Sequence, residues 1–385
     1  MKEADVEVPM EDSTEVLFIV PRFHTNYIGW LHGLSKLGIS FRILVQTIGK
    51  SENHSFQSPE KIDPGADYFR ISIFDSFRLD KHFMLFGQIK RIKPKLIIFR
   101  FELNITSIIF LINVLLSRTQ FLIYLQWPLY GANYPRRVLR TFFVAFLKVP
   151  TITPVLSCKD SWIGQGSIKN MSHGSFFIPF GMPTRDSNSI LTGSPLDIES
   201  LRFLTVGKFQ RRKNHIEAIQ GLMSNENFRN SNATFEIIGE VSDSEHFKVL
   251  DEVNTYVLEN HLENKILISV NINHDEVLKK IGESDIFILM SDSEPASISN
   301  LEAMSFGKPV LIKSGNGTAN YLNNQSGGFI IDSPEEFDQR INYFFDHPEF
   351  LSLCRTENLL TVKKLLDPEL VARKLLACAS YKVNC

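Results

Sequence analysis

Short apolar runs alternate with helical patterns along almost the whole chain, and this alternation constrains the fold more than any other feature. Val16–Val20, Lys95–Phe99 and Phe121–Leu125 are near-continuous apolar runs. Parallel strands that are covered by helices on both faces need such runs, because neither face meets water. Strands that alternate with helices form βαβ units. The sequence therefore predicts an α/β fold with parallel sheets.

A break in the middle of the chain separates two such series. Ile178–Pro183 carries two prolines and a glycine, and Asp186–Ser200 is polar. At 385 residues the chain has room for two domains of roughly 100–200 residues each. We therefore predict one domain over residues 1–182 and a second over residues 183–385, whose last helix can return to the first domain. Further elements are expected at Tyr27–Leu37 (helix), Phe41–Gln46, Phe203–Gly207, Phe235–Gly239, His246–Leu262 (helix), Ile266–Ile268, Asp285–Leu289, Pro309–Ile312 and Gly328–Ile331.

Composition excludes several classes of protein. The formal charge is −2, so no overall positive field attracts nucleic acid. The four cysteines lie far apart, without metal-ligand or redox spacing, and no histidine–cysteine cluster predicts a metal site. Met1–Thr14 is polar and lacks the apolar stretch of a signal peptide. We expect a cytoplasmic protein that needs no metal and binds no nucleic acid.

Two segments raise the question of membrane contact. Ile105–Leu116 is strongly apolar but falls well short of the roughly 20 residues that a membrane span requires, and we expect a buried element. Arg136–Lys148 combines basic and apolar residues at helical spacing. It is either a helix on the inner face of an anionic membrane or a helix that packs on the sheet with its arginines exposed.

The most informative segment follows the expected strand Asp285–Leu289. Glu294 stands at the carboxyl end of that strand, where ligands of α/β sheets bind. Pro295 suits the first turn of a helix, which would carry Ser297–Phe306 and end at Gly307. Glu302 on that helix has apolar neighbours and needs a partner, because an unpaired buried charge is costly.

This segment resembles the signature of retaining glycosyltransferase family 4, of the glycosyl transferases group 1. The signature has two glutamates with seven residues between them, and Glu294 and Glu302 match that spacing. The resemblance implies that Glu294 lies beside the donor sugar and that Glu302 binds the ribose hydroxyls. It also implies that the helix start at Ala296, Ser297 and Ile298 faces the diphosphate with free N–H groups. Relatives often have Phe-Gly where this chain has Ala-Ser.

A second segment, Val206–Asn214, is similar to another motif of the same family. Lys213 matches the family's lysine, and Lys208 stands where an arginine is more usual. Two cations beside a strand end can neutralise a diphosphate as it leaves. Lysine offers a point charge in place of a planar fork. Arg211 and Arg212 are interpreted as a solvated basic loop.

Weaker signals complete the expected donor site. The loop Lys313–Asn320 carries Asn316 and Gly317 where the family has a donor-binding loop, although a plain turn would look the same. Gly207 ends one strand, and Gly239 ends a strand in the neighbourhood of the nucleotide base. We include all four residues among the donor-binding candidates.

Polar residues also follow the first strand of the first domain. His24, Thr25 and Asn26 are candidates for contacts with acceptor or donor, and a purely structural His24 is an equal alternative. Gln126 and Trp127 stand where many relatives have a histidine that touches the donor sugar, and we assign them no catalytic role.

The resemblance implies a GT-B fold, in which two Rossmann-like domains face each other across a cleft, with the acceptor on the first domain and the donor on the second. It implies a retaining glycosyltransferase of the hexosyltransferase type, in which Glu294, Lys208 and Lys213 carry the chemistry. The expected partners are a nucleotide diphosphate sugar and a saccharide or lipid-linked saccharide acceptor, in polysaccharide or glycoconjugate biosynthesis. The alternatives are a non-catalytic GT-B scaffold, a sugar-nucleotide epimerase and a phosphorylase of the same fold.

Overall fold

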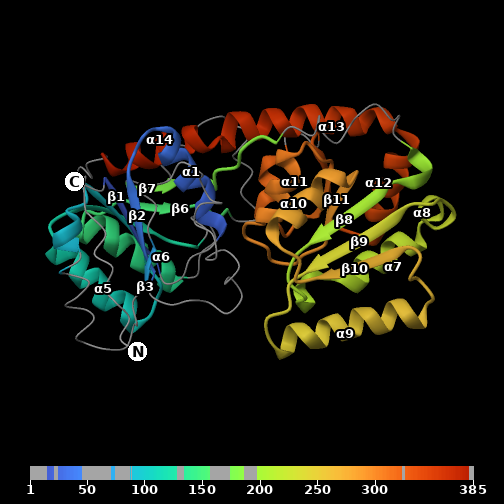
Figure 1. Cartoon of the computed structure of the whole chain (residues 1–385), viewed down its shortest axis with the longest axis horizontal. Coiled ribbons are helices and arrows are strands. Elements are labelled where there is room, and N and C mark those ends of the chain that lie inside the picture. The colour runs from blue at the N-terminus through green and yellow to red at the C-terminus, as the bar shows by residue number, and fades with distance from the viewer. Residues whose placement is uncertain are drawn as a thin grey trace, which may run out of the picture.

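Two parallel sheets lie side by side along the long axis of the molecule in the computed structural model (Figure 1). The structure describes residues 15–20, 25–45, 71–73, 87, 89–127, 134–156, 174–185, 197–322 and 326–380. The first sheet contains β1 (Val16–Val20), β2 (Phe41–Val45), β3 (Ile71–Ile73), β4 (Leu96–Arg100), β5 (Gln120–Tyr124), β6 (Thr151–Thr153) and β7 (Ser175–Phe177). The second contains β8 (Arg202–Val206), β9 (Thr234–Gly239), β10 (Ile266–Val270), β11 (Ile286–Leu289), β12 (Val310–Lys313) and β13 (Gly328–Ile331).

The two sheets share one topology. The strand order is β3-β2-β1-β4-β5-β6-β7 in the first sheet and β10-β9-β8-β11-β12-β13 in the second. In each sheet the order reverses between the first and fourth strands. Ligands of such sheets bind outside the carboxyl ends of the strands at this reversal. The sheets therefore point to the carboxyl ends of β8 and β11 as one place for a site.

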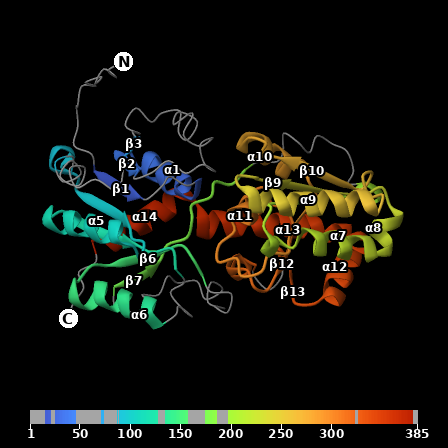
Figure 2. The ribbon, with the colours of Figure 1, turned by 90° about the horizontal axis from the view of Figure 1, so that it is seen from below.

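Helices cover both faces of each sheet. Among the described residues of the first half, they include α1 (Ile28–Lys36), α5 (Ile105–Leu116) and α6 (Tyr134–Thr141), which continues as the π-helical turn η2 (Phe142–Phe146). In the second half they are α7 (His215–Ser224), α8 (Glu226–Asn230), α9 (Ser244–Glu259), α10 (His274–Glu283), α11 (Ile298–Ser305), α12 (Pro334–Asp346), α13 (Pro348–Thr361), the π-helical turn η9 (Val362–Leu366) and α14 (Pro368–Ala379). Figure 2 shows α7 and α9 in front of the second sheet.

The buried strands explain the apolar runs. Along β1, Val16 and Phe18 belong to one apolar core, whereas Leu17 and Ile19 belong to another on the opposite face. Successive side chains of a strand point to opposite faces, so a strand that is covered twice must be apolar throughout. The predicted α/β fold with two parallel sheets is confirmed.

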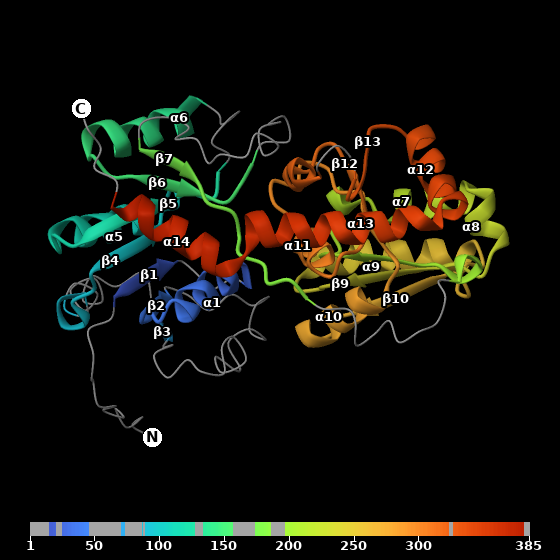
Figure 3. The ribbon, with the colours of Figure 1, turned by 90° about the horizontal axis from the view of Figure 1, so that it is seen from above.

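One apolar core runs through both halves of the molecule. It includes Trp30 of α1, Phe180 of the crossing segment, Leu301 of α11 and Leu375 of α14. Helix α14 returns from the second half and lies along α1, as Figure 3 shows from above. The approach is close, because a Cβ at Gly33 would collide with the backbone of α14. The crossing segment and the last helix therefore join the two halves.

The structure also corrects one expectation about burial. Ile105–Leu116 was expected to be a buried element, but α5 is buried on one face only. Phe110 and Val114 pack on the sheet, whereas Ile108 and Ile112 are exposed. A helix with apolar residues around most of its circumference gives too weak a periodic signal for its outer face to be identified.

Candidate active site

A cavity of about 640 Å³ opens at the carboxyl ends of β8 and β9, beside the beginnings of α10 and α11. It lies at the carboxyl edge of the second sheet, next to the reversal of strand order between β8 and β11. Of the residues that the sequence predicts for a donor site, the cavity is lined by Gly207, Lys208, Lys213, Gly239, Glu294, Ala296, Ser297, Ile298 and Glu302.

Backbone contacts fix the position of Glu294. The preceding residue, Ser293, has a φ of 51°, which non-glycine residues rarely adopt. The Glu294 N–H donates to the Gly315 carbonyl at 3.2 Å, and its carbonyl accepts from the Gly317 N–H at 2.8 Å. Glu294 is thereby held between the end of β11 and the loop after β12, with its side chain mostly buried at the cavity wall.

Two cations bind one oxygen of this carboxylate. The Lys213 ammonium and Nη1 of Arg212 each lie 2.5 Å from Glu294 Oε2. Burial lowers the pKa of Lys213, and the charge of Glu294 opposes that shift. A Cβ at Gly207 would lie only 3.2 Å from the Lys213 side chain, so this glycine gives the lysine room.

The Arg212 contact corrects the sequence interpretation of a solvated basic loop. Arg211, Arg212 and Lys213 form the 3₁₀ turn η6, in which successive side chains point in different directions. Arg211 reaches outward to Glu252 of α9, whereas Arg212 turns to Glu294. The order of basic residues in the sequence does not reveal these directions, and only the turn geometry separates the two arginines.

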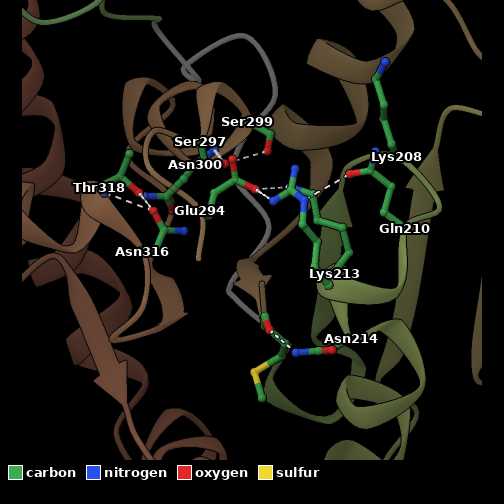
Figure 4. A network of polar contacts seen from close by, with 12 residues as sticks. Lys208, Gln210, Lys213, Asn214, Glu294, Ser297, Ser299, Asn300, Asn316 and Thr318 are labelled. Atoms are coloured by element: carbon green, nitrogen blue, oxygen red, sulfur yellow. Dashed lines mark hydrogen bonds and ion pairs between the residues drawn. The ribbon is translucent and has the colours of Figure 1, made fainter. Parts of the chain in front are cut away.

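Lys208 lies at a different wall of the cavity. Its ammonium is 3.4 Å from Glu240 Oε2, and Figure 4 shows its side chain running away from Glu294. His215 is buried beneath the loop that carries Lys208, where its ring packs against Phe209. Burial lowers the pKa of His215 to about 4. The two predicted lysines therefore pair with different carboxylates, Lys208 with Glu240 and Lys213 with Glu294.

The start of α11 differs by a few residues from the prediction. Ser297 is the N-cap, and its hydroxyl accepts from the Asn300 N–H at 3.2 Å, so Pro295 precedes the helix instead of lying in its first turn. The first helical N–H groups, at Ile298 and Ser299, lie beside the cavity. Such groups and the helix dipole favour an anion at this position.

Glu302 has a partner that the sequence interpretation missed. Nε2 of His274, the first residue of α10, lies 2.7 Å from Glu302 Oε1. Burial alone would lower the pKa of His274, but the hydrogen bond and charge of Glu302 outweigh it and the pKa is raised. A histidine that directly follows the helix-capping Asn273 after a strand was the available signal.

Asn316 and Gly317 do not line this cavity. Asn316 is fully buried, and its Oδ1 accepts from the N–H and the hydroxyl of Thr318 at 3.0 and 2.7 Å (Figure 4). A Cβ at Gly317 would collide with the Pro295 carbonyl. Both residues support Glu294 from behind, and a direct contact with the donor stays a prediction for them.

The first sheet presents its own polar residues at the carboxyl end of β4. The buried Arg100 guanidinium donates to the Tyr27 hydroxyl at 3.2 Å and to Gln126 Oε1. His24 and the side chain of Thr25 lie outside the described residues, and Asn26 lies half-buried in the short turn before α1. Within the described ranges, no cluster of three histidine, cysteine, aspartate or glutamate residues is placed to hold a metal ion. No helix in that part of the chain is long and apolar enough to cross a membrane.

Solved structures with the same architecture cover nearly the whole chain. A glycosyltransferase from Rickettsia africae superposes with a TM-score of 0.72 at 15% identity, over 96% of this chain and 98% of that one. HepE of Anabaena, solved with UDP and glucose, superposes with a TM-score of 0.68 at 13% identity, over 95% and 99% of the two chains. The chain has the GT-B fold. Sucrose-phosphate synthase from Thermosynechococcus elongatus shares the GT-B fold with a TM-score of 0.65 at 14% identity, over 94% and 98%.

Sequence comparison finds a family model that matches much of the second half of this GT-B protein. Residues 192–357 match the family model described as glycosyl transferases group 1. The matched range contains the whole second sheet and every residue that lines the cavity. No curated protein matches the chain in sequence. Residues 192–357 are thus similar to the glycosyl transferases group 1 family.

Proposed function

We propose that the protein is a retaining glycosyltransferase that moves a sugar from a nucleotide diphosphate sugar to an acceptor, in polysaccharide or glycoconjugate biosynthesis. One observation carries the proposal: a single cavity of about 640 Å³ is lined by Glu294, Glu302, Lys208 and Lys213, at the carboxyl edge of a parallel sheet. A volume of this size suits a ligand as large as a nucleotide sugar.

The two carboxylates divide the donor between them in this proposal. Glu302 accepts hydrogen bonds from the ribose hydroxyls, because a carboxylate can accept from two vicinal hydroxyls. The first N–H groups of α11 and the Lys213 ammonium bind the diphosphate, which lies between the ribose and the donor sugar. Glu294, at the other end, binds hydroxyls of the donor sugar. Lys208 lies beside the loop after β9. In this proposal the base and the first phosphate bind there.

The chemical step follows from this arrangement. The bond between the anomeric carbon and the diphosphate oxygen breaks, and Lys213 and the helix start stabilise the negative charge that gathers on that oxygen. The acceptor hydroxyl attacks the anomeric carbon on the same face, so the configuration is retained. Its proton passes to the departing diphosphate. The first domain supplies the acceptor side, with Asn26 as the described candidate and His24 and Thr25 as further candidates.

The first test is thermal shift of the protein with a panel of nucleoside diphosphates and their sugars, comparing the wild type with Glu302→Ala. We expect one donor to stabilise the wild type and to lose its effect in the variant. UDP is the first probe, since HepE was solved with it. A variant that binds donor and turns over normally would exclude the ribose role of Glu302.

The alternatives make different predictions in an assay of donor turnover. An epimerase alters the donor without any acceptor, and a phosphorylase requires free phosphate. A non-catalytic scaffold shows no donor turnover. The stereochemistry of the product decides between retention and inversion, and can be read from the anomeric coupling constant in the proton spectrum.

For the acceptor side we propose contact with an anionic membrane. Helices α5 and α6–η2 cover the same face of the first sheet, and their outer sides expose Ile108, Ile112, Val138 and Phe146. Between Leu103 and Leu156 the chain has five basic and no acidic residues. Apolar residues interspersed with cations suit the boundary of an anionic bilayer, where a lipid-linked acceptor resides.

Vesicle sedimentation tests this contact. We expect the wild type to bind vesicles that contain anionic lipid and not vesicles of zwitterionic lipid alone. Phe146→Ser should weaken binding, because Phe146 is 74% exposed and lies on η2. Phe247→Ser is the matched control: it is 61% exposed on α9 of the second domain and should have no effect. Equal binding to both kinds of vesicle would exclude the preference for anionic lipid, and binding to neither kind would exclude the contact.

A further inference from the structure

Three basic residues after β8 line the cavity, one more than the family motif uses: Lys208, Arg212 and Lys213. In the resemblance described above, an arginine and a lysine serve the diphosphate, and Lys208 stands at the arginine position. The structure places the Lys208 ammonium 3.4 Å from Glu240, away from Glu294 (Figure 4). Lys208 therefore supplies no planar donor pair beside Glu294, where the diphosphate joins the sugar.

Arg212, in the 3₁₀ turn η6, brings a guanidinium to Glu294. Its Nη1 lies 2.5 Å from Glu294 Oε2, the same oxygen that the Lys213 ammonium contacts. Its Nε donates to Gln210 Oε1 at 3.1 Å, and the Gln210 amide is 3.1 Å from the His246 ring. Among the described residues these are the only hydrogen bonds of the Arg212 side chain, which leaves Nη2 uncommitted there. The side chain is 44% exposed and lines the cavity.

The backbone holds this turn against the segment that carries Glu294. The Asp292 N–H donates to the Arg212 carbonyl at 2.8 Å. The Asn214 side chain, just after the turn, donates to the Met290 carbonyl at 2.9 Å and to Asp292 Oδ2 at 2.7 Å. Arg212 is thus fixed at the cavity wall at its backbone and, through Gln210, at its side chain.

An ordinary surface ion pair would look different, and the neighbouring arginine provides the example. Arg211 is 73% exposed, pairs with Glu252 at 2.5 Å on the outer side of α9, and does not line the cavity. Arg212 instead shares a mostly buried carboxylate with a buried lysine. Two cations on one carboxylate leave a net positive charge that a second anion can satisfy.

We propose that Arg212 binds the donor diphosphate through its guanidinium, in place of the arginine that Lys208 replaces, and that Glu294 is its counter-ion while the site is empty. This inference rests on the proposed function. Arrival of the diphosphate draws Arg212 and Lys213 onto phosphate oxygens, and the freed Glu294 oxygen accepts from the sugar. A guanidinium offers two parallel N–H groups to two phosphate oxygens, a planar fork that an ammonium lacks.

The test compares Arg212→Lys with Arg211→Lys, which makes the same chemical change one residue away. The probes are UDP, or the diphosphate of whichever base stabilises the wild type, and the matching monophosphate, each by titration calorimetry. We expect Arg212→Lys to raise the Kd of the diphosphate about tenfold, as the loss of one charge-assisted contact predicts, and to change the Kd of the monophosphate less. Arg211→Lys should leave both constants unchanged.

A rescue variant separates the role from a general loss of structure. Lys208→Arg combined with Arg212→Lys returns the guanidinium to the position that relatives use, and should recover most of the lost affinity. Unchanged diphosphate affinity in Arg212→Lys, in a protein whose wild type binds the diphosphate, would overturn the assignment and leave the proposed function standing. A wild type that binds no nucleoside diphosphate would overturn both.

Discussion

The two ends of the cavity hold their carboxylates in different ways. Glu294 is bound by an arginine and a lysine, Arg212 and Lys213, whereas Glu302 is bound by a histidine, His274. Two cations stand where the proposed reaction develops charge, and a histidine, whose ordinary pKa is about 6.5, stands where the proposed ribose binds. In the proposed function, the Glu294 end serves the chemical step and the Glu302 end tunes affinity for the donor.

The largest loss of activity is expected at the end of the cavity that holds Glu294. Lys213→Met removes the buried cation to which we assign stabilisation of the leaving diphosphate, and we expect kcat for sugar transfer to fall about 10²–10³-fold. Steady-state kinetics at saturating donor measure it. Lys280→Met is the matched control, because Lys280 also pairs with a carboxylate, Glu236 at 3.2 Å, but does not line the cavity. A similar fall in both variants would contradict the comparison.

Next in size is the acid stability that depends on His215. Burial holds the pKa of His215 at about 4, below the value of about 6.5 in an unfolded chain. Between these two values the unfolded state binds more protons, so stability falls as pH drops from 6.5 to 4, by at most about 3 kcal/mol. His215→Phe should flatten the decline in urea midpoint over this range. A parallel decline in variant and wild type would show that His215 protonates in the fold.

At the end of the cavity that holds Glu302, Glu302→Gln should weaken the binding of UDP about tenfold, because it replaces a charged acceptor for the ribose hydroxyls by a neutral amide. The comparison of UDP with 2′,3′-dideoxy-UDP isolates the contact. Wild type and variant should bind the dideoxy compound almost equally. A tenfold difference that persists for the dideoxy compound would place the effect of Glu302 outside the ribose.

The smallest effect is expected for His274→Gln. Burial and the charge of Arg185 lower the pKa of His274. The hydrogen bond and charge of Glu302, with a smaller contribution from Asp275, outweigh them, so the pKa is raised. The pair therefore stabilises the fold fully below about pH 6.5 and loses this contribution as pH rises through the raised pKa. Because the ring is partly exposed, the difference should stay under about 1 kcal/mol. Urea midpoints at pH 6 and pH 9 measure it, and a larger gap at pH 9 would be the opposite of our expectation.

Much of the second half could be predicted because its signals are local. The strand before Glu294, the helix that carries Glu302 and the glycine at its end, Gly307 with a φ of 71°, follow from periodicity and capping. A parallel sheet then brings the ends of its strands to one edge, so residues far apart in sequence meet there.

The rest depends on geometry that periodicity does not carry. The strands β3, β6 and β7 are three residues long, too short to give a pattern. The pairing of His274 with Glu302 joins two helices, and the sequence marks it only by the place of His274 directly after Asn273. The direction of Arg212 depends on a single 3₁₀ turn.

The return of α14 to the first sheet also bears on how the chain is made. Val371 and Leu375 of α14 belong to the same apolar core as Trp30 and Leu34 of α1, so the first domain lacks part of its core until the last helix exists. During synthesis from the N-terminus, the second domain has all of its strands before the first is complete. The domain that begins first is finished last, and truncation before Pro368 would leave α1 with an uncovered apolar face.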